Sequence, residues 1–228
     1  MSYTLITANR NYSSWSLRPW LLMKTLGIPF HDRLEPFHAS GSHAAFRSFS
    51  PTGQVPVLLD GAHTVWDSLG ITLYLADRHD GVFPQAAPAR AWAQCAVAEM
   101  HAGFAALRSR CTMNIGVRVQ TPPAPPELQR DIARIDELWG EGISRFGGPF
   151  LAGADFCAAD AFFAPVVFRA RTYGLPLCAA ARGWMEHMLA LPAMREWEAA
   201  ALTETFRDPD HEAELASCGT LTQDLRQK

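Results

Sequence analysis

Three short stretches of the chain combine residue types that can bind a small anionic ligand. The first is Asn11-Tyr12-Ser13-Ser14-Trp15-Ser16-Leu17-Arg18, which leads into an apolar helical pattern. A serine hydroxyl at the start of a helix can donate a hydrogen bond to an anion, and the helix N-terminus adds partial positive charge. For a ligand that carries a thiol, both effects favour the thiolate, at about 1.4 kcal/mol for each unit by which the pKa falls. Taken alone, such serines most often only cap the helix.

The second and third stretches each allow a structural and a functional interpretation. In Ser50-Pro51-Thr52-Gly53-Gln54-Val55-Pro56-Val57-Leu58, a proline interrupts a good strand pattern. Pro56 either stands at a strand entry or follows a cis peptide bond that exposes the backbone N–H and C=O of Val55 to a ligand. In Trp66-Asp67-Ser68, Asp67 and Ser68 either cap a helix or bind a carboxylate together with the exposed N–H groups.

The elements that must position these stretches form a small α/β layer. Strands rich in β-forming residues are predicted at 3–8, 30–36, 55–59 and 63–66. One helix begins at Ser16 or at a serine just before it and ends at Gly27. Pro19 fits this helix only if it lies in the first turn. A second helix follows Asp67.

The predicted secondary structure changes after a linker at Pro84 to Pro88. Strand patterns disappear, and alanine-rich helices are predicted at about 89–111, 126–145, 158–173, 179–190 and 192–202. Residues 203–228 contain six acidic and three basic residues and predict a loosely held polar tail.

Composition excludes several classes of function. The 228 residues are 48% hydrophobic and carry a net charge of −3, which argues against a nucleic-acid or anionic-membrane partner. No apolar run reaches the ~18 residues of a membrane span and no signal peptide is visible, so a cytoplasmic protein is expected. The five cysteines form no C-x-x-C pair and all follow residue 94, which favours neither a metal site nor a disulfide framework.

Together, the three stretches resemble the cytosolic glutathione transferase family, and the resemblance covers nearly the whole chain. Gln54-Val55-Pro56 and Asp67-Ser68 match the glutathione site of that family, and Ser13-Ser14-Trp15-Ser16-Leu17-Arg18 looks like the serine-type, zeta-class motif S-S-C-S-x-R. The resemblance implies an α/β thioredoxin-like N-terminal domain (1–80) and an all-α helical C-terminal domain with a polar tail (88–228).

The resemblance also implies roles for individual residues. Ser13 would stabilise the glutathione thiolate, with Ser14 as the neighbouring candidate and Tyr12 ranked below both. Val55, presented by a cis Pro56, would pair its backbone with the cysteinyl part of glutathione. The remaining expected contacts are Gln54 to the tripeptide backbone and Asp67 with Ser68 to the γ-glutamyl end.

Some positions depart from the family pattern. Trp15 replaces the zeta-class cysteine, and no lysine lies between Lys24 and Lys228 to hold the glycine carboxylate, a role for which His43 is the candidate. Cys157-Ala158-Ala159-Asp160 matches the family's capping box with sulfur in place of the hydroxyl. Sulfur is a weak acceptor, so Asp160 is expected to stabilise the helix start largely alone.

The expected function is that of a glutathione transferase, with glutathione as co-substrate and no metal. Its thiolate would attack a small, mostly apolar electrophile between the domains, beside the first C-terminal helix with its Arg108. A homodimer is expected from the family. The alternatives are a non-catalytic binding or assembly protein with the same fold and a glutathione-dependent isomerase. A thiol oxidoreductase is disfavoured because the N-terminal part has no cysteine.

Overall fold

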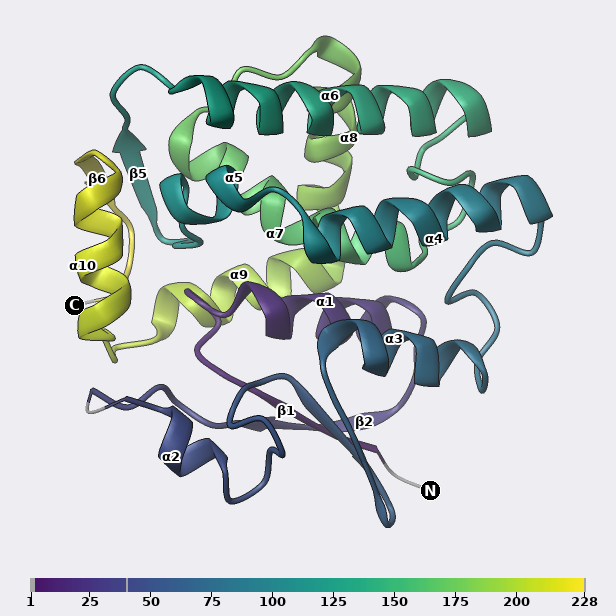
Figure 1. Cartoon of the computed structure of the whole chain (residues 1–228), viewed down its shortest axis with the longest axis horizontal. Coiled ribbons are helices and arrows are strands. Elements are labelled where there is room, and N and C mark those ends of the chain that lie inside the picture. Colours follow the sequence, from purple (N-terminus) through teal and green to yellow (C-terminus); the bar gives the residue numbers. More distant parts are fainter. Residues whose placement is uncertain (1–2, 40, 228) are drawn as a thin grey trace.

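A four-stranded sheet forms the base of the computed structural model, which describes residues 3–39 and 41–227 (Figure 1). Its strand order is β2-β1-β3-β4, with β1 and β2 parallel and the other neighbours antiparallel. The strands are β1 (Tyr3–Thr7), β2 (Phe30–Leu34), β3 (Val57–Asp60) and β4 (His63–Val65). All four predicted strands are therefore confirmed, and Pro56 lies directly before β3 rather than inside it.

Helices α1 (Ser14–Thr25) and α3 (Ser68–Ala76) lie between the sheet and the helical half of the molecule (Figure 1), while the short α2 (His43–Phe46) flanks the sheet. Pro19 lies inside α1 and not in its first turn, so that expectation was wrong. An interior proline costs a helix about 3 kcal/mol. Helix α1 tolerates it because it is buried among the sheet, α3, α7 and α9, where Leu17, Trp20 and Leu21 are almost fully covered.

The second half of the chain is mainly helical, as predicted. The chain therefore consists of a thioredoxin-like unit followed by a helical unit. The helices of the second unit include α4 (Ala87–Ala102), α5 (Ala105–Arg110), α6 (Pro126–Phe146), α7 (Ala158–Tyr173), α8 (Ala179–Ala190) and α9 (Pro192–Thr203). The single helix expected at 89–111 is in fact two. Phe104 adopts a left-handed backbone conformation (φ 60°), which ends the first helix, and the Arg108 side chain binds the freed carbonyls of Met100 and Gly103. None of the helices within 3–39 and 41–227 has the length and apolar character needed to cross a membrane.

The C-terminal residues are folded, which corrects the expectation of a loosely held tail. They form α10 (Pro209–Cys218) and β6 (Thr220–Asp224), and β6 pairs antiparallel with β5 (Val117–Gln120), so this half is not all-helical. Leu215 and Cys218 are the buried residues of α10. Arg226 forms ion pairs with Glu212 and Asp224 within this segment, and Glu212 also accepts hydrogen bonds from Tyr12 and Asn114, whereas composition alone suggested a solvated chain.

Asp160 anchors the start of α7, the most deeply buried helix, as the capping-box pattern predicted. Its carboxylate is fully buried and accepts hydrogen bonds from the backbone N–H groups of Leu151 (2.9 Å) and Cys157 (3.0 Å). The indole Nε1 of Trp184 donates to the same carboxylate at 3.2 Å. One side chain thus joins α7 to α8 and to the loop before α7.

Replacing Asp160 by alanine should lower the free energy of unfolding by about 3 kcal/mol, because three buried N–H donors lose their acceptor. Chemical denaturation followed by tryptophan fluorescence measures the change. Asp155→Ala, at an exposed position in the same loop, is the control and should change stability by less than about 0.5 kcal/mol. Equal effects of the two substitutions would contradict the anchoring role.

Candidate functional site

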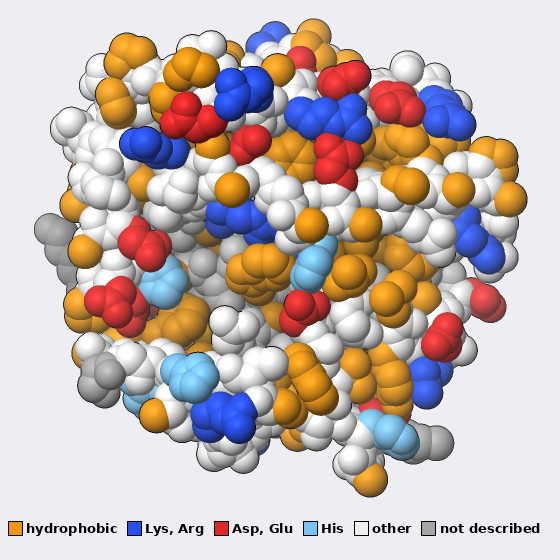
Figure 2. All heavy atoms as spheres, viewed as in Figure 1, with side chains coloured by type: hydrophobic (Ala, Val, Ile, Leu, Met, Phe, Trp, Pro, Cys, Tyr) orange, Lys and Arg blue, Asp and Glu red, His pale blue; other side chains and the backbone are white. Residues whose placement is uncertain are grey.

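A cavity of about 630 Å³ opens between the sheet half and the helical half of the molecule. Figure 2 shows this face hollowed between the two halves, with hydrophobic side chains inside the hollow and acidic and basic side chains around it. Six parts of the chain, far apart in sequence, contribute to its walls: residues 12–15, 37–56, 66–67, 108–113, Arg169 and 208–214.

Most of the residues singled out from the sequence come together here. Ser13, Ser14, Gln54, Val55, Pro56 and Asp67 all line the cavity. The Val55–Pro56 peptide bond is cis, and Pro56 also stands directly before β3, so both structural features considered for this proline are present. Ser68 does not reach the cavity: its side chain is fully buried, and its hydroxyl lies 3.5 Å from Nη1 of Arg18.

His43 also lies outside the cavity lining. It is exposed on α2, and its ring is packed against Gly53, where an added Cβ would lie only 2.6 Å from the imidazole. Histidines from two other segments, His38 and His211, line the cavity instead. His211 could not be predicted from the sequence, because only the folded C-terminal segment brings it to this wall.

The two candidate serines differ in what their hydroxyl groups bind. The Ser13 hydroxyl donates to Oγ of Ser16 at 2.7 Å, so its proton points into the protein. Ser14, the first residue of α1, instead accepts a hydrogen bond from Nη2 of Arg169 at 3.4 Å. The Ser14 hydroxyl therefore keeps its own proton available for a ligand in the cavity.

Positive charge without a carboxylate partner surrounds Ser14. Arg169 donates to the backbone carbonyls of Cys111 and Arg108, and burial lowers its pKa to about 10. Burial, together with the charges of Arg108 and Arg169, also lowers the pKa of Arg18 well below its usual value. Within residues 3–39 and 41–227, none of these three guanidinium groups forms an ion pair with a carboxylate. This end of the cavity is therefore suited to an anion.

Trp15 organises the arginines around the start of α1. The Arg18 guanidinium lies 4.2 Å from the centre of the indole ring and the Arg108 guanidinium 4.7 Å, both at cation–π distance. The His101 ring meets the indole edge-on at 5.4 Å. The tryptophan that departs from the family motif thus supports the positive charges beside Ser14.

Asp67 supplies negative charge at another part of the same cavity. It caps α3 by accepting the N–H of Leu69 at 2.9 Å, yet 53% of its side chain is exposed. Nε2 of His101 lies 3.5 Å from its carboxylate. Burial lowers the pKa of His101, so this ring is neutral near pH 7 and leaves the carboxylate free to bind a cationic group.

Two residues named from the sequence, Tyr12 and Arg108, lie in the wall of the cavity. The Tyr12 hydroxyl donates to Oε1 of Glu212 at 2.7 Å, and burial together with this bond raises the pKa of Tyr12. Its proton is therefore not available to a ligand. Arg108, expected beside the electrophile, lines the cavity together with Met113.

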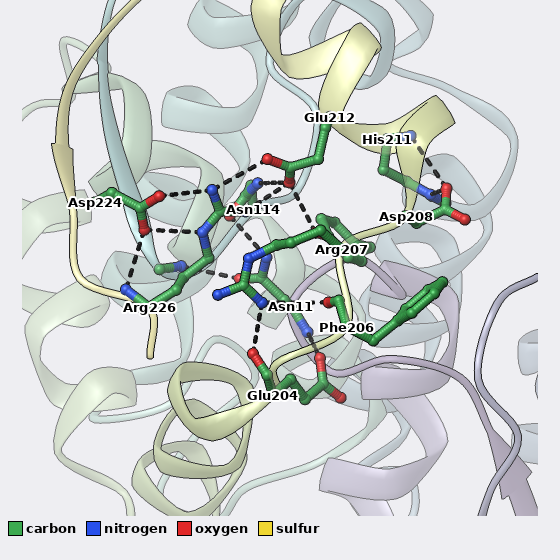
Figure 3. A network of polar contacts seen from close by, with 12 residues as sticks. Asn11, Asn114, Glu204, Phe206, Arg207, Asp208, His211, Glu212, Asp224 and Arg226 are labelled. Carbon is green, nitrogen blue, oxygen red and sulfur yellow. Dashed lines mark hydrogen bonds and ion pairs between the residues drawn. The ribbon is translucent and has the colours of Figure 1, made fainter. Parts of the chain in front are cut away.

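The C-terminal segment, residues 203–227, holds in place the loop before α1, which carries Asn11 and Tyr12 (Figure 3). Glu212 accepts from Tyr12, from Nδ2 of Asn114 (3.3 Å) and from both Nη atoms of Arg226. Arg226 also pairs with Asp224 at 2.7 Å, and its side chain is only 4% exposed. The loop before α1 is thus tied to the last residues of the described chain.

The comparisons with known proteins agree with this geometry. Residues 12–78 match the family model described as "Glutathione S-transferase, N-terminal domain". Glutathione S-transferase theta-3 of Mus musculus is 30% identical over 62% of this chain and 62% of its own length. Dichloromethane dehalogenase of Methylorubrum extorquens is 36% identical over 26% of this chain. The chain spans about a fifth of that dehalogenase and less than two thirds of the theta-3 protein.

Solved structures agree on the fold. A glutathione transferase homolog from a Burkholderia strain, solved with bound glutathione, superimposes with a TM-score of 0.66 at 19% identity. The match covers 88% of this chain and 98% of the other. The expected glutathione transferase fold, a thioredoxin-like unit followed by a helical unit, is therefore confirmed.

Replacing Arg226 by glutamine should loosen the C-terminal segment and lower the free energy of unfolding by about 2 kcal/mol or more, because Glu212 loses its charged partner. Hydrogen bonds from Arg226 keep the pKa of Asp224 low and, with the Tyr12 hydroxyl, outweigh the burial that would raise the pKa of Glu212. A lowered carboxyl pKa stabilises the fold at neutral pH, and this contribution disappears as the pH falls below about 4.

Denaturation at several pH values tests this prediction. The destabilisation by Arg226→Gln should be full above about pH 5 and should shrink as the pH falls through the low pKa values of the two carboxyl groups. Arg195→Gln, at an exposed position on α9, serves as the control. A destabilisation that is the same at every pH would show that the ion pairs do not carry the effect.

Proposed function

We propose that this chain is a member of the cytosolic glutathione S-transferase family, and that it binds glutathione and holds its sulfur as a thiolate for attack on a small, mostly apolar electrophile. The observation that carries the proposal is the Ser14 hydroxyl, which faces the cavity with its proton free and with the buried Arg169 behind it. Glutathione would enter as a co-substrate and leave in the product.

Ser14, rather than Ser13, is the proposed hydroxyl donor. The proton of Ser13 is directed to Ser16, whereas the oxygen of Ser14 accepts from Arg169 and can pass its own proton into a hydrogen bond with sulfur. Ser14 also begins α1, so the exposed N–H groups of the helix point toward the same place. The assignment rests on this geometry and does not depend on whether residues 13–18 are a zeta-type motif.

The positive end of the cavity supports thiolate formation. A thiolate in a partly buried site is stabilised by nearby positive charge. In the part of the chain that the structure describes, the buried guanidinium group of Arg169 forms no ion pair with a carboxylate, and Arg18 adds a second buried guanidinium group. The thiol proton would leave to solvent, and the sulfur would then attack the electrophile at the apolar wall formed by Trp15 and Met113.

The rest of glutathione would follow the cavity away from Ser14. Val55, before the cis bond to Pro56, lines the cavity, and its backbone N–H and C=O would pair with the cysteinyl backbone. Asp67, half-exposed, would bind the cationic amino group of the γ-glutamyl end. Gln54 also lines the cavity and would contact the tripeptide backbone. Ser68, because it is buried, supports α3 and Arg18 in this arrangement and does not touch the ligand.

The experiment that tests the proposal combines glutathione binding with the two serine variants. Isothermal titration should detect glutathione binding to the wild-type protein. Ser14→Ala should raise the pKa of the bound thiol by about 1–2, since a hydrogen bond to a charged group contributes about 1.5–3 kcal/mol. The ultraviolet absorbance of the thiolate during a pH titration reports this change. The kcat/KM for conjugation of chlorodinitrobenzene should fall about 100-fold.

Ser13→Ala is the matched control and should keep kcat/KM within about threefold, because its hydroxyl faces Ser16. A large loss in Ser13→Ala with full activity in Ser14→Ala would overturn the assignment. No glutathione binding at millimolar concentration would overturn the transferase proposal and favour a non-catalytic binding or assembly protein.

A homodimer forms a second part of the proposal. Trp66 and Leu73, at the start of α3 and along it, are 44% and 48% exposed and offer apolar surface next to the cavity. Size-exclusion chromatography with light scattering should give twice the chain mass of 25.1 kDa. Leu73→Glu should shift this mass toward the monomer, whereas Leu34→Glu, at a similarly exposed site on β2, should not. A wild-type protein of monomer mass would contradict the prediction.

A further inference from the structure

A histidine–aspartate pair at the start of α10 lies in the cavity wall and has no part in the function proposed above. Nδ1 of His211 lies 2.6 Å from Oδ2 of Asp208, and the same oxygen accepts the backbone N–H of His211 at 3.2 Å. The Asp208 side chain is only 5% exposed, whereas that of His211 is 30% exposed and lines the cavity. Figure 3 shows the pair on α10, apart from the Arg226 ion pairs.

Two aromatic rings fix the plane of the imidazole. Tyr12 stacks on it with ring centres 4.9 Å apart and an angle of 25°, and Phe37 lies against it at 4.7 Å and 35°. Nδ1 is bound to Asp208, so Nε2, at the other edge of the ring, is the nitrogen that remains for a ligand. Within residues 3–39 and 41–227, Nε2 has no hydrogen-bond partner and is not closed off from solvent.

This arrangement makes Nε2 a place where a proton can be held or released. A carboxylate can only accept hydrogen bonds, so Asp208 keeps a proton on Nδ1 in both charge states of the ring. The second proton of the imidazolium then sits on Nε2, and the ring lines the cavity that Ser14 also lines. A histidine whose other nitrogen is fixed by a buried carboxylate is the usual form of a general acid or base.

We propose that His211 is a general acid for electrophiles on which addition of a thiolate produces an oxyanion, namely epoxides and α,β-unsaturated carbonyl compounds. The inference rests on the proposed function, since it needs the thiolate at Ser14. The general acid distinguishes these electrophiles from halides. Displacement of a halide needs no proton, so neither Asp208 nor His211 contributes to such a reaction.

The proton balance of the step is simple. The glutathione sulfur, already deprotonated to solvent, forms a bond to an epoxide carbon, and the C–O bond breaks with its electron pair moving to oxygen. This oxygen takes the proton from Nε2 of His211, which leaves a neutral imidazole. The imidazole regains a proton from solvent, so the sum is glutathione plus epoxide giving a thioether alcohol.

The test compares two electrophiles in one protein. Styrene oxide requires the proton, whereas chlorodinitrobenzene does not. His211→Gln should lower kcat for styrene oxide about 100-fold or more and leave kcat for chlorodinitrobenzene within about twofold. His31→Gln, at an exposed position on β2, is the control and should change neither. Added imidazole should restore styrene oxide turnover in His211→Ala, which a purely structural role would not allow.

Asp208→Asn provides a second, conservative variant, because asparagine caps a helix as well as aspartate does. It removes the charge beside Nδ1 and should lower styrene oxide turnover about 10-fold or more while chlorodinitrobenzene turnover is kept. Equal losses for both electrophiles, or a change only in the KM for glutathione, would overturn the general-acid role.

The failure of this inference is distinguishable from failure of the proposed function. A wild-type protein that conjugates chlorodinitrobenzene but not styrene oxide overturns the role of His211 and leaves the transferase proposal in place. A protein that binds no glutathione and turns over neither electrophile overturns both.

Discussion

The candidate site depends on a buried guanidinium group that forms no ion pair with a carboxylate among residues 3–39 and 41–227. Arg169 projects from α7, the central helix, and donates to the backbone carbonyls of Arg108 and Cys111 and to the Ser14 hydroxyl. Burying an unpaired charge costs several kcal/mol even after relaxation of the surroundings. The unpaired guanidinium group makes the electrostatic potential positive where α1 begins. An anion that binds there would stabilise the guanidinium group and offset part of its desolvation free energy.

The close packing of α1 against α7 makes this arrangement possible. Helix α1 belongs to the sheet half and contributes Ser14, whereas α7 belongs to the helical half and contributes Arg169. The fully buried apolar residues of both helices fix their separation, and Asp160 fixes the start of α7. The distance between Ser14 and Arg169 is therefore set by the core of the molecule and not by a flexible loop.

The sequence predicts the local parts of this site and fails for the parts that depend on long-range pairing. The patterns around Ser13 and Ser14, Val55 and Asp67 predict the start of a helix or strand, and those elements form where their patterns place them. The sequence ranks Ser13 before Ser14, because the partners of the two hydroxyl groups depend on the fold. Arg169 lies in a mostly apolar helix, and nothing in the sequence around it distinguishes it from an arginine that is exposed at the surface. The pairing of Arg226 with Glu212 spans 14 residues of an apparently solvated segment, so composition suggested a loose tail.

The folded C-terminal segment divides the cavity chemically. The N-terminal unit supplies the groups that would hold a peptide-like ligand: the Val55 backbone, Asp67 and the start of α1. Residues 208–214 supply a titratable ring and several carboxylates to the remaining wall. Tyr12 couples the two, because its hydroxyl binds Glu212 while its ring stacks on His211. A substitution in the C-terminal segment can thus change the groups that face a second substrate while the residues that would bind the peptide-like ligand stay the same. The ion pair between Glu212 and Arg226 holds residues 208–214 in the cavity wall when such a substitution is made.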